Sequence, residues 1–324
     1  MKSFESVGTI CLKGQNNFIY KICKITYKVR NDTMKIKITS ENNYAVLGLD
    51  GAMLNSLNKN GTEYLWQGDS KYWAGQAPVC FPINGVLPNG EMEAFGKKCT
   101  MKRHGVARIN PFEVDEQCKN SVTFVQHSNE NTKREFPFDY ELKIKYTICG
   151  DTVTNEYIIK NTGDCDLPFV IGGHPAFNCP IDSDEKFEDY KVVFDKNITK
   201  PCLRPDHHSG LVDVSQKFDE MHGGNTLPLV HELFEEKDAL IFENCEAKSA
   251  TLIGKNGKGI KIEYQDMNNL LVWSAVGNAP FVALEPWTGL ASCSDEDGIF
   301  EHKRGMTVLA PNEIASFKFK ITMI

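Results

Sequence analysis

The strongest constraint on the fold of this chain is a strict alternation of apolar and polar residues with a period of two. From residue 140 to residue 148, apolar side chains occupy every second position, and polar side chains occupy the positions between them. Successive side chains of a β-strand point to opposite faces, so this pattern is typical of an antiparallel strand with one buried face. The apolar members are Tyr140, Leu142, Ile144, Tyr146 and Ile148, and the polar members are Glu141, Lys143, Lys145 and Thr147.

The alternation recurs at 34–39, at 259–264 and at 317–321, so strands are predicted along much of the chain. Turn-forming sequences separate the strands at hairpin-like intervals, as Lys-Asn-Gly does at 255–257 and Pro-Asn-Gly does at 88–90. The chain therefore alternates between short strands and tight turns, which indicates antiparallel pairing of neighbouring segments.

Helical periodicity is scarce, and the segment 231–237 is its best example. We therefore predict an all-β fold, a large antiparallel β-sandwich with few helices. The chain has 324 residues, of which 41% are hydrophobic, and all-β domains of this length often form one unit. No internal repeat or Pro/Ser-rich linker divides residues 34–324, which we predict to be a single domain.

Residues 1–33 differ from the rest because they are rich in lysine and weakly patterned, and they end where the first clean strand begins. We treat them as an N-terminal extension with three open interpretations. They form an additional edge strand, they form a mobile arm, or they lie upstream of the true start codon. Residue 34 is thus the predicted domain boundary.

The charge and the cysteines limit the class of protein. The formal net charge is −7 and the pI is about 5.7, whereas nucleic-acid binding requires a basic face. No apolar run approaches the ~20 residues that cross a bilayer, and the N-terminus lacks the apolar core of a signal peptide. The 11 cysteines have no C-x-x-C pair or zinc-type spacing, so we expect free thiols and no metal site. We therefore expect a cytoplasmic protein that binds neither nucleic acid nor membrane.

A first candidate site lies at the end of an apolar strand, in the sequence Phe-Val-Ile-Gly-Gly-His-Pro-Ala-Phe-Asn at 169–178. Gly172 and Gly173 permit a close approach of backbone or ligand, and Pro175 holds His174 in an extended conformation. The imidazole is therefore expected at a fixed strand end rather than on a mobile loop. A purely structural role is the alternative interpretation of this histidine.

A second candidate site lies in the sequence Phe-Val-Ala-Leu-Glu-Pro-Trp at 281–287. By alternation, Glu285 shares a face with Phe281 and Ala283. A carboxylate on an apolar strand face is costly unless it is paired or functional, so a salt bridge is the alternative interpretation. Trp287 is either an apolar platform for a ligand such as a sugar or a part of the core.

Two further segments carry weaker signals. His104 and Arg108 belong to the sequence Lys-Arg-His-Gly-Val-Ala-Arg at 102–108, where the histidine can reach a ligand and the arginine can hold a cluster of oxygen atoms. Asp238 precedes the apolar run 239–242, and a capping or turn role is its alternative interpretation.

Together these segments resemble the aldose 1-epimerase (galactose mutarotase-like) superfamily, and especially its LacX-like branch. The resemblance runs from about residue 34 to residue 324, and the order and spacing of its short motifs make it specific. The motifs are GAMLNSL, EYLWQGDSKYW, APVCFPING, HGVAR, GGHPAFN, HELFEEKDALIF and VALEPWTGL. The resemblance implies the β-supersandwich of these epimerases, which is consistent with the strand pattern above.

The resemblance also implies roles for individual residues. Glu285 matches the catalytic carboxylate of the family, which acts as general base, and His174 matches the histidine that acts as general acid. His104 matches a second histidine, which binds and orients the sugar. Asp238 matches an aspartate that hydrogen-bonds the sugar hydroxyl groups.

The implied activity is that of an isomerase that interconverts the α and β anomers of an unphosphorylated aldohexose. A base takes the proton of the C1 hydroxyl while an acid protonates the ring oxygen O5, and the C1–O5 bond breaks. Closure from the other face then gives the other anomer. Nothing is oxidised and no group leaves, so neither a metal nor a nucleotide cofactor is expected. Each positioned acid or base typically contributes ~10²–10⁴ in rate.

A sister branch that acts on hexose 6-phosphates is the nearest alternative. Its members bind the phosphate with paired arginines, one of which matches Arg108, whereas the other falls at Ala-Gly-Gln, residues 74–76, and a further basic position falls at Val86. With six arginines in the chain, the sequence favours an unphosphorylated sugar. The remaining alternatives are a non-catalytic carbohydrate-binding or regulatory protein, and a glycosidase that uses Glu285 and Asp238 as its two carboxylates.

Overall fold

The computed structural model describes residues 5–9, 22–26 and 35–324, and the chain divides into two units, Met1–Met34 and Lys35–Ile324. In the first unit, strand β1 (Glu5–Thr9) pairs antiparallel with strand β2 (Ile22–Thr26). The interpretations of residues 1–33 as an edge strand, an arm or an upstream segment concern residues that lie mostly outside the described ones. The site lies in the second unit.

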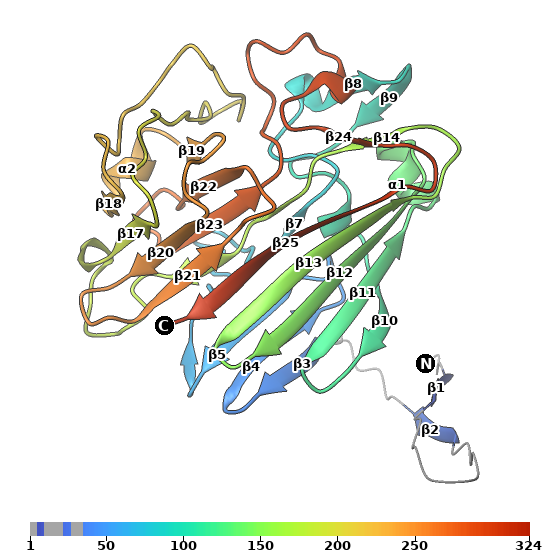
Figure 1. The fold of residues 1–324 in the computed structure, drawn as a ribbon, viewed down its shortest axis with the longest axis horizontal. Coiled ribbons are helices and arrows are strands. Elements are labelled where there is room, and N and C mark those ends of the chain that lie inside the picture. Colours follow the sequence, from blue (N-terminus) through green and yellow to red (C-terminus); the bar gives the residue numbers. More distant parts are fainter. Residues whose placement is uncertain (1–4, 10–21, 27–34) are drawn as a thin grey trace. The chain divides into compact units, whose positions relative to one another are not determined.

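The largest sheet of the second unit has nine antiparallel strands in the order β10-β11-β12-β13-β25-β21-β20-β17-β18 (Figure 1). Its longest pairing joins β12 to β13 in continuous register from Tyr140↔Asn161 to Cys149↔Thr152. Its strands are β10 (Glu113–Gln117), β11 (Ser121–His127), β12 (Tyr140–Cys149), β13 (Thr152–Asn161), β25 (Ile314–Met323), β21 (Gly259–Glu263), β20 (Ser249–Ile253), β17 (Lys191–Phe194) and β18 (Thr226–Pro228).

A second sheet of six strands carries the chemistry described below. Its order is β19-β22-β23-β15-β7, and β16 pairs with β23 beside β15. Its strands are β19 (Leu240–Phe242), β22 (Asn269–Trp273), β23 (Phe281–Trp287), β15 (Gly172–Gly173), β16 (Ala176–Asn178) and β7 (Val79–Cys80).

Smaller sheets and short helices complete the second unit. The four-stranded sheet β3-β4-β5-β6 lies against the nine-stranded sheet, since β3 contacts β11 and β12. The remaining strands are β3 (Lys35–Ser40), β4 (Asn43–Gly48), β5 (Leu54–Lys59), β6 (Thr62–Glu63), the pair β8 (Glu91–Ala94) and β9 (Lys97–Thr100), and the pair β14 (Leu167–Phe169) and β24 (Thr307–Leu309). The helices are α1 (Glu130–Glu135), α2 (Glu232–Glu235) and the 3₁₀ turns η1 (Pro88–Gly90), η2 (Ala107–Ile109), η3 (Phe187–Asp189) and η4 (Phe300–His302).

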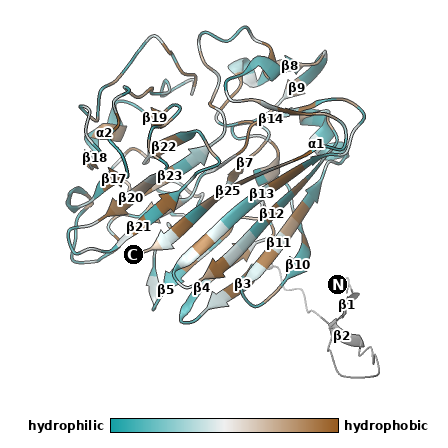
Figure 2. Ribbon diagram, in the orientation of Figure 1, coloured by the Kyte–Doolittle hydropathy of each residue, from teal (hydrophilic) through white to brown (hydrophobic). Residues whose placement is uncertain are grey.

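The observed strands confirm the predicted all-β, antiparallel fold. Along β12 every second residue is buried, in the phase that the alternation predicts, and Figure 2 shows the matching change of hydropathy along the strands of this sheet. The helical segment predicted at 231–237 shortens to the single turn α2, because the chain enters strand β19 at Leu240. None of the helices among the described residues is long and apolar enough to cross a membrane.

Strand β23 separates the core from the site. Its residues Val282 and Leu284 join the main apolar core, which also contains residues of the nine-stranded and four-stranded sheets. Phe281 and Ala283 belong to a separate aromatic cluster on the opposite face. The two faces alternate as the sequence predicts, so Glu285 lies on the face that is turned away from the main core.

Candidate active site

All six residues singled out in the sequence line one cavity of about 310 Å³. They come from four separate stretches of chain: strand β23, the turn between β15 and β16, the segment that leads into and includes η2, and the residue two positions before β19. They are Glu285, Trp287, His174, His104, Arg108 and Asp238. Residues far apart in the sequence thus converge on a single concave site.

Glu285 and His174 form the centre of this site. Glu285 lies on β23, and His174 occupies the turn between β15 and β16, which both pair with β23. The distance between His174 Nε2 and Glu285 Oε2 is 3.4 Å, and the two side chains are 8% and 2% exposed. Because both flanking strands are in register with β23, the sheet itself holds the carboxyl group beside the imidazole.

The two glycines before His174 bring the backbone close to aromatic side chains. A Cβ atom at Gly172 would lie 2.2 Å from Trp287 Cδ1, and a Cβ atom at Gly173 would lie 2.7 Å from Phe319 Cζ. Real Cβ atoms do not approach other atoms so closely, so any side chain at either position would displace the strand. The close approach predicted from the sequence is therefore an approach of backbone to protein.

Burial sets the protonation of the central pair. It raises the pKa of Glu285 well above its ordinary value, and the nearby Asp238 adds to this effect while Arg103 opposes it. Burial also lowers the pKa of His174 to about 3. Burial therefore disfavours the charged form of both groups. A neutral carboxyl with a neutral imidazole carries as many protons as a carboxylate with an imidazolium, so one proton transfer across the pair converts the first state into the second.

A hydrogen bond from the backbone of Gly85 fixes the tautomer of His104. Its φ of 66° lies in the left-handed region, and its backbone N–H donates to the carbonyl oxygen of Gly85 at 2.7 Å. The Gly85 N–H donates to His104 Nδ1 at 3.2 Å, so Nδ1 bears no proton and the neutral ring carries its proton on Nε2. Burial, then His174 and Arg108, lower the pKa of His104 well below its ordinary value. His104 is therefore a neutral donor through Nε2.

Asp238 and Arg108 lie at the rim of the cavity. Arg204 Nη1 donates to the backbone carbonyl of Asp238 at 3.4 Å, whereas the Asp238 carboxylate bonds no group among the described residues. The alternative capping role is therefore not supported. Arg108 Nε donates to the carbonyl oxygen of Arg103 at 3.0 Å, which ties the two arginines together.

Three lining residues had no predicted role. Trp73 stacks on the imidazole of His174 with ring centroids 4.9 Å apart, and Trp273 meets that imidazole edge-on at 5.3 Å. Arg103 lines the cavity next to Arg108. Trp73 belongs to the motif EYLWQGDSKYW, and Arg103 directly precedes the motif HGVAR, so both lie in or next to a motif of the sequence. Nothing in the sequence around Trp273 marks it, and only the pairing of β22 with β23 brings it to the site.

Trp287 is 3% exposed and lies in the wall of the cavity. The partly exposed Trp73 and Trp273 are therefore the better platforms for a ligand.

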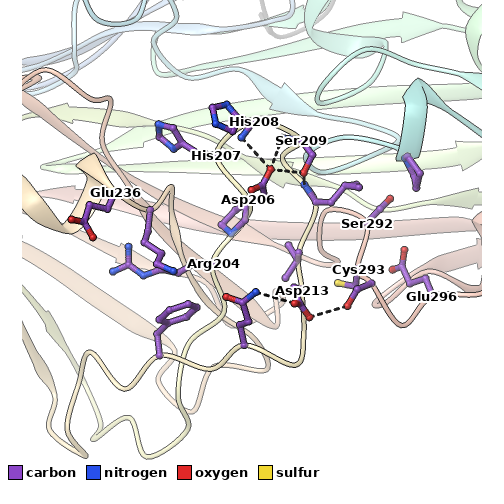
Figure 3. A pocket seen from close by; sticks show the side chains of 18 residues that line it. Arg204, Asp206, His207, His208, Ser209, Asp213, Glu236, Ser292, Cys293 and Glu296 are labelled. Carbon is purple, nitrogen blue, oxygen red and sulfur yellow. Dashed lines mark hydrogen bonds between the residues drawn. The ribbon is translucent and has the colours of Figure 1, made fainter.

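A larger cavity of about 640 Å³ adjoins the site across the loop 205–211, and Figure 3 shows its side chains. Three of its charged residues have partners in the neighbouring structure. Asp206 accepts hydrogen bonds from Ser209, and the buried Arg204 donates to Glu220 at 2.9 Å. Glu296 accepts from Lys303 at 2.9 Å. The exposed His207 at its rim contacts no part of the central pair, as expected for a surface loop.

Metal ligation finds no support in the described part of the chain, where no three His, Cys, Asp or Glu residues are grouped to hold an ion. The cavity combines a carboxyl group beside an imidazole, a second imidazole, two tryptophan rings and two guanidinium groups. Apolar ring faces suit the C–H surface of a cyclic ligand, and the polar groups suit its hydroxyl oxygens. The arrangement can move protons on a small polyhydroxylated ring.

Comparison with known proteins agrees with this geometry. A family model described as aldose 1-epimerase matches residues 24–322. The plasmid-encoded and chromosomal LacX proteins of Lactococcus lactis subsp. lactis are each 32% identical to the chain over 309 residues, which is 93% of this chain and 100% of each relative.

Solved structures show the same fold. A galactose mutarotase related enzyme from Lactobacillus acidophilus superposes with a TM-score of 0.84 at 29% identity, covering 90% of this chain and 97% of its own. A galactose mutarotase-like protein from Lactobacillus casei superposes with a TM-score of 0.83 at 30% identity, covering 90% of this chain and 100% of its own. The predicted mutarotase-like β-supersandwich is confirmed.

Proposed function

The chain belongs to the aldose 1-epimerase family, and from this premise we propose that it interconverts the α and β anomers of an unphosphorylated aldohexose. The observation that carries the proposal is the 3.4 Å contact between His174 Nε2 and Glu285 Oε2 in a cavity lined by aromatic rings. The two oxygens that exchange protons in this reaction, O1 and O5, are bonded to the same carbon. An acid and a base that touch each other can therefore reach both oxygens of one sugar.

The central pair performs the proton transfers. The proton of the Glu285 carboxyl group passes to His174 Nε2, which leaves a carboxylate beside an imidazolium. Glu285 then takes the proton of the C1 hydroxyl while His174 donates its Nε2 proton to O5, and the C1–O5 bond breaks. After rotation about C1–C2, the reverse transfers close the ring on the other face. Each step conserves protons within the site, so no cofactor enters the scheme.

The remaining lining residues hold the sugar. His104 offers its Nε2–H to a sugar oxygen, because Gly85 occupies its other nitrogen. Asp238 has a carboxylate with no protein partner in the described chain, which suits it to accept from sugar hydroxyl groups. Trp73 and Trp273 present ring faces to the C–H surface of the pyranose.

A second candidate function is the epimerisation of a hexose 6-phosphate, and one observation favours it. Arg103 and Arg108 both line the cavity, and neither forms an ion pair with a carboxylate among the described residues. Guanidinium groups bind phosphate through two parallel hydrogen bonds, and two of them in one cavity form a suitable clamp. Arg103 replaces the arginine that the sequence lacks at residues 74–76.

The proposal includes a cytoplasmic location. The nine cysteines of residues 35–324 are all free thiols, and six of them are buried. Reduced thiols are typical of a reducing compartment. The proposed partner is the sugar itself.

The test is an anomerisation assay on freshly dissolved α-glucose, α-galactose and the corresponding 6-phosphates, followed by NMR. We expect the wild-type protein to accelerate equilibration of an unphosphorylated hexose and Glu285→Gln to lose that acceleration. Acceleration of the 6-phosphates alone would replace the first candidate with the second, and Arg103→Ala would then abolish it.

Two other outcomes would reject the enzymatic activity or its proposed mechanism. Saturable sugar binding without any change in the equilibration rate would assign a binding or regulatory role. Undiminished acceleration by Glu285→Gln would remove the acid–base pair from the mechanism.

A further inference from the structure

A third and much smaller cavity, of about 10 Å³, lies behind His174, on the side of the nine-stranded sheet. Its lining residues come from β5, β12, β13, β25 and the turn at His174. Most of the lining is apolar, and four residues bring side-chain polar atoms. They are His174, Asn155, Tyr146 and Tyr157.

Two of these polar residues each have a buried atom without a partner. His174 Nδ1 and Asn155 Oδ1 are both inaccessible to solvent, and neither makes a hydrogen bond to any described residue. His174 and Asn155 are 7% and 4% exposed, so bulk water does not reach these atoms. Leaving buried polar atoms unpaired costs free energy, and native proteins usually pair them with protein or with an ordered water molecule.

The orientation of the Asn155 amide follows from its neighbour. Asn155 Nδ2 donates to the hydroxyl oxygen of Tyr157 at 3.3 Å, which leaves the acceptor Oδ1 free. The Tyr157 hydroxyl lies against the backbone next to His174, since a Cβ atom at Gly173 would be 3.0 Å from it, and both residues line the cavity. Three polar groups therefore surround the small cavity. A volume of this size holds about one water molecule, and buried waters typically make about three hydrogen bonds.

We propose that this cavity binds one water molecule that joins His174 Nδ1 to Asn155 Oδ1, which makes Asn155 a positioning residue for His174. The water accepts a hydrogen bond from Nδ1–H and donates one to Asn155 Oδ1, and the Tyr157 hydroxyl is its third partner. Asn155 lies on β13 in the nine-stranded sheet, so a residue of the opposite layer sets the state of the catalytic ring.

The water fixes which nitrogen of His174 carries the proton. With the proton on Nδ1, the neutral ring presents a bare Nε2 to Glu285, and Nε2 can accept the carboxyl proton across the 3.4 Å contact. The water and Asn155 then stabilise the Nδ1–H of the imidazolium, as second partners of catalytic histidines generally do. The catalytic part of this inference rests on the proposed function, whereas the tautomer does not.

The first experiment measures the tautomer directly. ¹⁵N NMR of histidine-labelled protein separates protonated from bare ring nitrogens, and His174→Gln identifies the His174 signals by their loss. We expect wild-type His174 to carry its proton on Nδ1. In Asn155→Leu, which removes the acceptor, we expect that preference to weaken, whereas Asn155→Asp keeps an oxygen acceptor and restores it.

Asn43→Leu is the matched control. Like Asn155, Asn43 is 4% exposed and has a buried Oδ1 without a partner. Its Nδ2 instead donates to Gly150 and Asp151 in the turn between β12 and β13, and Asn43 does not line the cavity. We expect it to leave the His174 spectrum unchanged. A wild-type proton on Nε2, or an Asn43→Leu shift as large as that of Asn155→Leu, would overturn the proposal. So would a high-resolution crystal structure without water in the cavity, a measurement that needs no variant to fold.

The second experiment measures turnover in the anomerisation assay. We expect Asn155→Leu to lower kcat about 10–100-fold with KM nearly unchanged, and Asn155→Asp to recover most of the loss. A change in KM alone would contradict the positioning role. If the wild-type protein does not turn over any sugar, the proposed function fails, and the NMR result still decides the water site.

Discussion

The two neighbouring cavities differ in how their charged groups are paired. In the larger cavity, Arg204 and Glu220 form an ion pair at 2.9 Å, and Asp206 is bound by its own loop. In the active-site cavity, Glu285 Oε2 is buried without a hydrogen bond to a described residue, and so is Nδ1 of its neighbour His174, which faces the small cavity behind the ring. Arg204 Nε of the larger cavity is also buried without a partner, so the contrast lies in the carboxyl groups: a buried carboxyl oxygen without a hydrogen bond lowers stability, at a cost that folding alone does not explain.

Two glutamates make the contrast concrete. The Glu296 side chain beside the larger cavity is 8% exposed and accepts hydrogen bonds from Lys303 Nζ at 2.9 Å and from the Arg304 N–H at 3.3 Å. The Glu285 side chain is 2% exposed, and burial raises its pKa. The same side chain thus forms a buried ion pair in one place and is the proposed proton carrier in the other.

The largest expected effect is on catalysis in the active-site cavity, which contains Glu285 and His174. His174→Gln removes the proposed acid, so we expect the anomerisation rate to fall about 10²–10⁴-fold while the fold is retained. His208→Gln, at the exposed rim of the larger cavity, is the matched control and should keep the full rate. An equal loss of rate in the two variants would show that the active-site cavity is no more important for turnover than the larger cavity.

The next effect is on stability beside the larger cavity. Lys303→Met leaves the Glu296 carboxylate buried without its ammonium partner, and breaking a buried pair in this way costs about 3–5 kcal/mol. We expect a lower midpoint in urea denaturation and an unchanged rate for each folded molecule. The double variant Glu296→Gln/Lys303→Met should recover most of the stability. A loss of turnover in the folded single variant would show that the two cavities are coupled.

The smallest effect is on the pH dependence of stability. The pKa of His104 is lowered in the folded protein, so below pH ~6.5 the unfolded chain binds the proton more readily. This contribution to stability is complete above pH ~6.5 and is lost as the pH falls toward the folded-state pKa, by up to about 1.4 kcal/mol per pH unit.

His104→Asn should therefore flatten the decline in urea-unfolding free energy between pH 6.5 and pH 5. Asparagine is chosen because it tolerates the left-handed backbone of this position. His207→Gln replaces an exposed imidazole, so its pH profile should match that of the wild type. A steeper decline in His104→Asn would show that the sign of this contribution is wrong.

The strands were predictable because their pattern is local. The alternation at 140–148 and its recurrence near residue 317 correspond to β12 and β25, with burial in the predicted phase for β12. In β25 the same alternation sets in only from Phe319, because Phe317 stays partly exposed. The segment 231–237 was less predictable, because a single helical turn is stabilised by its neighbours rather than by its own pattern.

The site was predictable where chemistry interrupts a pattern. Glu285 stands out as a charge on an apolar strand, and His174 stands out between glycine and proline. Trp273 does not stand out, because an aromatic residue in a strand is ordinary. Arg103 does not stand out, because the resemblance places the second arginine of the pair at residues 74–76 and matches only Arg108 in this segment.

By itself, the sequence determined which segments become strands, which face of each strand is buried and which side chains are chemically out of place, because these properties depend on residues within a few positions of one another. The tertiary structure alone decided that Glu285 and His174 touch, that Arg103 joins Arg108, and that Asn155 of another sheet lines the cavity behind the imidazole. Those contacts depend on the pairing of strands that are distant along the chain. No local pattern encodes the register in which they meet.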